Sequence, residues 1–131
     1  FGSGPGEFSR AMAIEVFGDL VYVCDTVNHR VQIFDLDGAF VRQVGQTGGD
    51  GHRMKYPYDA ATLPDGGILA CEYGNNCVSH FDASGEFRGS YGGPGRGLGQ
   101  FHGPRGVAVS AAGRVYVADT ENHRIQVFTW A

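Results

Sequence analysis

The chain has 131 residues, enough for one domain and too few for a second core. Its formal net charge of −4 disfavours nucleic acid as a partner. No apolar run is long enough to span a bilayer, no segment resembles a signal peptide, and the compartment is left open. The 22 glycines separate short runs rich in Tyr, Phe, Val and Ile, which is typical of all-β proteins.

Three successive segments, residues 1–45, 46–92 and 93–131, each contain a series of short strands separated by turn residues. Apolar and polar residues alternate within each strand, and Gly, Asp or Pro follows it, as in half-buried β-strands. The third segment has three such strands where the others have four. Strands are expected at 11–16, 20–25, 30–34 and 39–45, then at 58–63, 68–72, 75–81 and 86–92, and finally at 106–109, 114–119 and 124–128.

One ten-residue motif occurs in each segment. DTVNHRVQIF at 25–34 and DTENHRIQVF at 119–128 are near copies, and EYGNNCVSHF at 72–81 is an eroded one, so the period is 47 residues. In each copy an apolar run ends in an acid, a polar turn follows with Asn at its centre, and a second alternating run begins. The motif therefore predicts a β-hairpin, with the Asn in the left-handed conformation that tight connections need.

The charged residues of the motif are expected to be structural. In the outer copies, the acid and the Arg five residues later flank one turn and can form an exposed ion pair across it. We expect this pair to hold the turn and not to perform chemistry. The turn residues given this role are Asp25, Asn28, Arg30, Asp119, Asn122 and Arg124.

The pattern Phe-x-x-Pro-x-Gly-Val-Ala-Val, followed by Gly-x-Val-Tyr-Val-Ala-Asp-Thr-x-Asn-His-Arg-Ile-Gln-Val-Phe, resembles the NHL repeat, the unit of NHL-type β-propellers. Residues 101–128 carry it almost in full, 8–45 well and 56–92 loosely. The resemblance implies an all-β propeller segment of three four-stranded blades, the last one incomplete. It implies less about function, because the family includes enzymes, RNA-binding modules, extracellular sensors and scaffolds.

Three blades are half of the six that the resemblance implies. Blades bury their apolar faces only against neighbours, so a three-bladed chain would expose one face at each end. Two copies could close a six-bladed ring as a homodimer. The alternative is that these residues are a fragment of a longer six-bladed propeller.

Propeller ligands usually meet the loops at one mouth of the central channel. Aligning the repeats places Arg10, Tyr58 and Arg105 just before the first strands, and Asp59 replaces the Gly at position 106. Arg offers a planar fork of donors that suits carboxylate or phosphate. We therefore expect a channel-mouth site for a small anionic ligand or a peptide, the alternative being solvated rim residues.

Two His residues are candidate metal ligands because they lie in loops that lead into first strands. These are His52 and His102, but their offsets from the next Pro differ, and zinc needs three or four converging ligands. No metal site, cofactor or catalytic set is therefore predicted, which favours a non-catalytic binding scaffold. The alternatives left open are an RNA-binding NHL module and a metal-dependent lyase-type enzyme, since the family that the chain resembles includes amidating lyases.

The middle repeat has a His and two Cys at strand positions. His80 takes an apolar position of the third strand and is expected to be a satisfied buried His or a local irregularity. Cys71 and Cys77 flank the middle hairpin; two reduced thiols are expected there, with a strained disulfide as the alternative. The odd number of three cysteines disfavours a disulfide framework.

Overall fold

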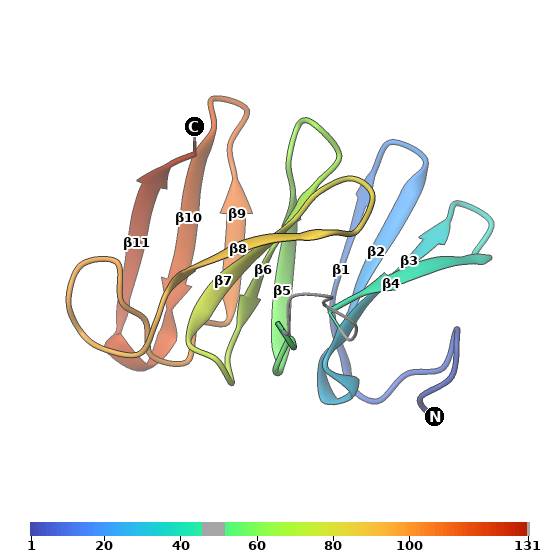
Figure 1. Cartoon of the computed structure of the whole chain (residues 1–131), viewed down its shortest axis with the longest axis horizontal. Coiled ribbons are helices and arrows are strands. Elements are labelled where there is room, and N and C mark those ends of the chain that lie inside the picture. Colours follow the sequence, from blue (N-terminus) through green and yellow to red (C-terminus); the bar gives the residue numbers. More distant parts are fainter. Residues whose placement is uncertain (46–51, 131) are drawn as a thin grey trace.

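The structure, a computed structural model, describes residues 1–45 and 52–130. Its strands form three antiparallel sheets that stand side by side in chain order, coloured from blue to red in Figure 1. We name these sheets blade 1, blade 2 and blade 3. Blade 1 contains β1 (Ala11–Phe17), β2 (Leu20–Asp25), β3 (Arg30–Asp35) and β4 (Phe40–Val44), blade 2 contains β5 (Pro57–Thr62), β6 (Ile68–Glu72), β7 (Cys77–Phe81) and β8 (Phe87–Gly92), and blade 3 contains β9 (Gly106–Val109), β10 (Arg114–Asp119) and β11 (Arg124–Thr129).

The predicted all-β class with successive four-stranded sheets is confirmed, and in the described residues the third blade has three strands as expected. Each predicted strand agrees with an observed one to within two residues at either end. The helical backbone in the described residues is two short 3-10 turns, η1 (Thr26–Asn28) and η2 (Thr120–Asn122), and none of it could cross a membrane. Residues 46–51, which precede His52 in the predicted loop before the first strand of the second segment, lie outside the described residues.

Apolar contacts between blades form the core. Successive side chains of a strand point to opposite faces, and the strands carry apolar residues on both faces, so each blade can pack on two neighbours. Between blades 1 and 2 the buried residues are Tyr22, Cys24, Val31, Ile33, Val44, Met54, Ala60, Ile68, Ala70 and Phe81. Between blades 2 and 3 they are Ala61, Leu63, Leu69, Cys71, Val78, Phe101, Val107, Val115 and Val117.

The first strands of the blades, β1, β5 and β9, lie next to one another along the row (Figure 1). Hydrogen bonds to carboxylates join them: Thr62 N–H donates to Glu15 Oε2 and Val107 N–H donates to Asp59 Oδ2, both at 3.1 Å. Burial raises the pKa of Glu15 and of Asp59. These three edge strands are the inner strands that a propeller channel requires, and the loops before them correspond to the predicted mouth.

The unusual residues of the middle repeat have distinct environments. All three cysteines are free and buried, which confirms the expectation of reduced thiols, and burial raises the pKa of Cys77 to about 12. His80 is not a satisfied buried His: its Nε2 is buried without a hydrogen-bond partner in the described part of the chain. Its ring meets Trp130 edge-on, with 4.8 Å between centroids, and burial lowers the pKa of His80.

Candidate functional site

The hairpin motif fastens the loop that leads into each first strand. In blade 1, the carboxylate of Asp25 accepts hydrogen bonds from Ser9 N–H (2.8 Å), Asn28 Nδ2 (3.0 Å) and Arg30 Nε (2.8 Å). Arg30 also donates to two backbone carbonyls of the preceding loop. In blade 3 the same contacts involve Asp119 with His102 N–H (2.8 Å), Asn122 (3.0 Å) and Arg124 (2.7 Å). The motif thus fixes the position of the loop before the first strand, where the mouth is predicted.

Two expectations about this motif are wrong. The blade 1 ion pair is buried, since the side chains of Asp25 and Arg30 are 0% and 4% exposed. The left-handed residue is also not the central Asn but the residue that follows it, His29 (φ 57°), Asn76 (φ 53°) and His123 (φ 55°). In blades 1 and 3 a short 3-10 segment ends at the Asn, and the Asn side chain bonds the carboxylate.

The blade 3 copy of the motif is more open. The side chain of Arg124 is 29% exposed, while that of Asp119 is 0% exposed. Burial raises the pKa of Asp119, but hydrogen bonds from His102 N–H, Asn122, Arg124 and Gln126 outweigh burial and hold that pKa below its ordinary value. Asp119 is therefore an ionised carboxylate at neutral pH.

Blade 2 forms the equivalent carboxylate-centred hydrogen bonds with other residues. Glu72 replaces the Asp and Cys77 replaces the Arg, so no guanidinium reaches the carboxylate from that position. Instead, His52 Nε2 lies 2.9 Å from Glu72 Oε2, and Asn75 Nδ2 donates to Oε1 at 2.6 Å. The His52 ring stacks on Phe87 of β8, with 4.2 Å between centroids.

The two metal candidates have different surroundings. His52 contacts the Glu72 carboxylate and lies beside β8, the outermost strand of blade 2. His102 is exposed in the loop before β9, where its backbone N–H bonds Asp119. Over residues 1–45 and 52–130, no three side chains of His, Cys, Asp or Glu converge as metal ligands would.

Strand pairing revises the alignment of the channel mouth. Each loop that leads into a first strand contains one residue with a left-handed backbone at the equivalent position: Arg10 (φ 55°), Tyr56 (φ 50°) and Gly103 (φ 57°). Arg10 therefore corresponds to Tyr56, and placing it with Tyr58 and Arg105 was wrong by two residues. The position of Tyr58 and Arg105 is held in blade 1 by Met12.

Arg105, at the predicted mouth, lies over a pair of tyrosine rings. Its guanidinium carbon is 5.3 Å from the ring centroid of Tyr58 and 5.2 Å from that of Tyr73, and the two rings stack at 5.3 Å. This is cation–π geometry, which holds the exposed guanidinium of Arg105 in place. Asp59 follows Tyr58 in β5. Arg105, and not Arg10, is the Arg that lies over these rings in the described part of the chain.

Sequence reasoning missed Tyr73 because it lies in the hairpin of blade 2, where the outer copies have Thr. It also missed a link between successive blades. Tyr56 N–H donates to His29 Nδ1 at 3.0 Å, and Gly103 N–H donates to Asn76 Oδ1 at 2.9 Å. The left-handed hairpin residue of one blade thus binds the left-handed lead-in residue of the next.

Both ends of the row expose an apolar blade face. In blade 1, Ile14 and Val16 on β1 are 71% and 61% exposed. In blade 3, Ile125 and Val127 on β11 are 70% and 51% exposed. The blade 1 counterparts of the latter two, Val31 and Ile33, are 0% and 2% exposed, because blade 2 covers them.

Sequence comparison identifies relatives of this chain. The family profile described as "NHL repeat" matches residues 14–34 and 101–128. The chain is 30% identical over 132 residues to the "Protein brain tumor" of Drosophila melanogaster, covering 98% of this chain and 12% of that protein. It is 33% identical over 104 residues to the "E3 ubiquitin-protein ligase NHLRC1" of Rattus norvegicus, covering 79% of this chain and 24% of that protein. The chain thus spans a quarter or less of these relatives.

Solved structures share the fold at lower identity. The structure titled "Streptogramin B lyase structure" superposes with a TM-score of 0.67 and 20% identity, covering 97% of this chain and 38% of that one. The "Myxococcus xanthus Glutaminyl Cyclase" superposes with a TM-score of 0.62 and 15% identity, covering 93% and 58%. At these identities the likeness establishes the propeller architecture and leaves the chemistry of this chain open.

Proposed function

Because the chain belongs to the NHL-repeat family of β-propellers, we propose that it is a non-catalytic binding scaffold in which two copies close a six-bladed ring. Blade 3 of each copy packs on blade 1 of the other, and the ring presents one channel mouth built from both copies. That mouth binds a small anionic ligand or a peptide carboxylate through Arg105 on its tyrosine platform, with Arg10 on the same rim.

The observation that carries the proposal is the match between the two open faces and the faces already packed inside the row. The open face of blade 3 repeats the face that blade 1 presents to blade 2: Tyr116, Ala118, Ile125 and Val127 replace Tyr22, Cys24, Val31 and Ile33. The outward face of blade 1 repeats the face that blade 3 presents to blade 2: Ile14, Val16, Val21, Val23, Gln32 and Phe34 replace Val107, Val109, Val115, Val117, Gln126 and Phe128. Ile14 and Val16 form the exposed part of that face, whereas Val23, Gln32 and Phe34 are already buried in the single chain. A closed ring would use both matches twice.

Polarity is also matched along the inner strands of the proposed contact. Between blades 1 and 2, the Glu15 carboxylate needs the Thr62 N–H and hydroxyl as partners. In the contact between copies, Ala108 takes the place of Glu15 and Val16 takes the place of Thr62. An apolar pair thus replaces a polar one, and no carboxylate is buried without a partner there.

Two hydrogen bonds between blades can be repeated across the same contact. Thr26 Oγ1 donates to the Pro57 carbonyl at 2.7 Å, and Thr120 is the blade 3 counterpart of Thr26. His123 is the counterpart of His29, whose Nδ1 accepts from the next lead-in residue. The proposed ring therefore pairs His123 with the N–H of Arg10 in the second copy.

Substituting His123 tests this arrangement. His123→Ala should weaken self-association, because the N–H of Arg10 in the other copy loses its acceptor. His123→Asn should retain it, because Asn76 performs this role in blade 2. Equal dissociation constants for the Ala variant and the unchanged chain would contradict the proposed pairing.

Anion binding at the mouth is tested with inorganic phosphate as the probe. Replacing both Arg10 and Arg105 with Ala should abolish phosphate binding measured by calorimetry while leaving the solution mass unchanged. Arg114→Ala is the matched control, since Arg114 is an exposed Arg that starts β10 at the opposite end of the blade. Unchanged phosphate affinity in the double variant would refute the site without affecting the ring.

A further inference from the structure

The junction between blades 2 and 3 differs from that between blades 1 and 2 at the end where the first strands begin. In blade 1 the hairpin residue Thr26 is buried, and its Oγ1 donates to the Pro57 carbonyl of blade 2 at 2.7 Å. Tyr73 and Pro104 stand 47 residues after these two. A Tyr thus replaces, in blade 2, a Thr that links the first two blades.

Gly103 makes room for the ring of Tyr73. Arg10, Tyr56 and Gly103 hold the same left-handed position before the first strands, and the last of them has no side chain. A Cβ atom on Gly103 would lie 2.7 Å from the Tyr73 ring, closer than such atoms approach one another. The first junction therefore has Thr in the hairpin and Tyr before the first strand, whereas the second has Tyr and Gly.

The ring of Tyr73 meets two residues that share one position of the repeat. Tyr58 and Arg105 are 47 residues apart, and with Tyr73 they form a triangle. The rings are 5.3 Å apart, and the guanidinium carbon lies 5.3 Å from the Tyr58 centroid and 5.2 Å from that of Tyr73. The corresponding positions of the first junction hold Met12, Thr26 and Tyr58, none of which is a cation.

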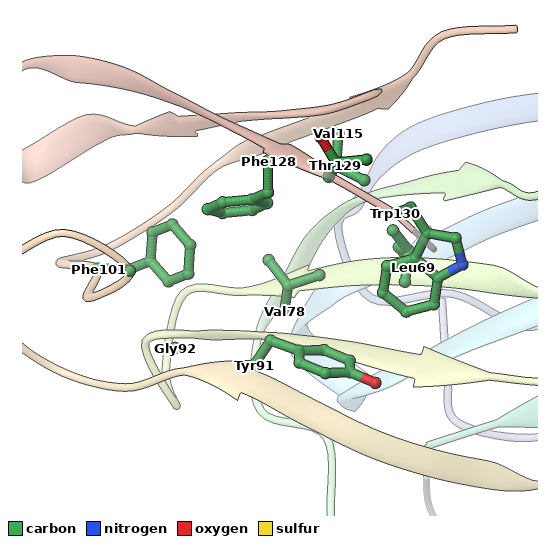
Figure 2. Close-up of a pocket in the computed structure, with 10 residues that line it drawn as sticks. Leu69, Val78, Tyr91, Gly92, Phe101, Val115, Phe128, Thr129 and Trp130 are labelled. Carbon is green, nitrogen blue, oxygen red and sulfur yellow. The ribbon is translucent and has the colours of Figure 1, made fainter. Parts of the chain in front are cut away.

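Blades 2 and 3 are also joined by contacts that do not involve Tyr73. Their apolar side chains form a buried cluster, and Figure 2 shows Val78, Phe101 and Phe128 around a cavity of about 360 Å³ within it. Gly103 N–H donates to Asn76 Oδ1 at 2.9 Å. A departure from the repeat at a junction that other contacts already hold is typical of a functional position.

We propose that Tyr73 is the positioning residue of the anion site, because it holds the Arg105 guanidinium against Tyr58. This role rests on the proposed function, in which Arg105 binds the anion. Ordering a long side chain on binding costs about 0.5–1.5 kcal/mol, and a guanidinium that two rings already hold avoids part of that cost. Removing the Tyr73 ring should therefore weaken anion binding by up to about 2- to 13-fold.

Two substitutions of Tyr73 separate this role from a structural one. Tyr73→Thr introduces the residue of the other two blades, and its hydroxyl should bond the Pro104 carbonyl as Thr26 bonds Pro57. The affinity for inorganic phosphate, measured by calorimetry, should fall in this variant while the melting temperature is retained. Tyr73→Phe keeps the ring and should retain the full affinity.

Tyr91→Thr is the matched control for the loss of a Tyr side chain. Tyr91 lies on β8, the outermost strand of blade 2, where its ring meets Trp130. This variant should bind phosphate as the unchanged chain does. A fall in affinity in both the Tyr73→Phe and Tyr73→Thr variants, or one that follows the melting temperature, would overturn the positioning role.

The side chain of Arg105 provides a second measurement that needs no ligand. A guanidinium over aromatic rings has its N–H resonances shifted by the ring currents, and the Arg105 Nε–H signal is identified by its loss in Arg105→Lys. The shift should persist in Tyr73→Phe and diminish in Tyr73→Thr. An unchanged shift in the Thr variant would overturn the positioning role.

Failure of this role and failure of the anion site give different results. If Arg105→Ala abolishes phosphate binding and Tyr73→Thr leaves it unchanged, the positioning role is wrong and the anion site stands. If the unchanged chain does not bind phosphate, the anion site is refuted and the positioning role with it.

Discussion

Replacing Ile125 with Ala is expected to weaken self-association and leave the fold intact. The Ile125 side chain is 70% exposed in the single chain, while its counterpart Val31 is 0% exposed where blade 2 covers it. Fully burying an Ile contributes about 1.5–3 kcal/mol, so covering the exposed part contributes roughly 1–2 kcal/mol per contact. The ring contains the contact twice. The variant should therefore lose about 2–4 kcal/mol, a rise of about 30- to 700-fold in the dissociation constant.

Sedimentation equilibrium over a concentration series measures this dissociation constant directly. Leu98→Ala is the matched control, because Leu98 is 95% exposed in the loop between β8 and β9 and lies on neither open face. Thermal unfolding of both variants checks that the blades remain folded. If the Ile125 and Leu98 variants self-associate equally, the face of blade 3 is not a contact surface and the reasoning fails.

Three further predictions concern the single chain. Arg30→Ala should lower the free energy of unfolding by about 3–5 kcal/mol in urea denaturation, because Asp25 would be left buried without its cation. Gly92→Ala should cost about 1–3 kcal/mol more than Gly38→Ala, because both have positive φ but only at Gly92 would the new Cβ lie 2.4 Å from an aromatic ring. Cys77, whose pKa burial raises to about 12, should react with a thiol reagent at neutral pH only after unfolding.

Each of these has a clear contrary result. An Arg30 variant as stable as the unchanged chain would mean that water compensates the Asp25 carboxylate and that the Asp25–Arg30 ion pair is dispensable for stability. Equal losses at Gly92 and Gly38 would mean that backbone strain, and not the clash, determines the cost. Rapid labelling of Cys77 in the folded protein would show that blade 2 opens readily.

The fold could be read from the sequence because the repeat is explicit. Two near-identical hairpins lie one repeat before and one repeat after an eroded copy, and this arrangement predicts the strand order. Alternation within each strand predicts which residues face a neighbouring blade. The backbone conformation of the hairpin turn could not be predicted from the sequence. Nothing in the order Asn28-His29 indicates that a 3-10 segment places the left-handed backbone at the second of these residues.

The channel mouth was predicted only in part. Arg105 lies over Tyr58, but the lead-in to β1 is offset from that to β5 by 46 residues, whereas placing Arg10 with Tyr58 requires 48, so Arg10 lies two residues before their position. Tyr73 lies in a hairpin whose residues were expected to have only a structural role. Its contact with Arg105 depends on how blades 2 and 3 lie against each other, so no linear pattern marks it.

The mass of the unchanged chain in solution tests the central claim most directly. Self-association through the matched faces of blades 1 and 3 predicts a folded species of about twice the 14.0 kDa of one chain, measured by light scattering during gel filtration. A folded species that remains at 14.0 kDa at high concentration would contradict the ring, because both apolar faces would then be stable in water.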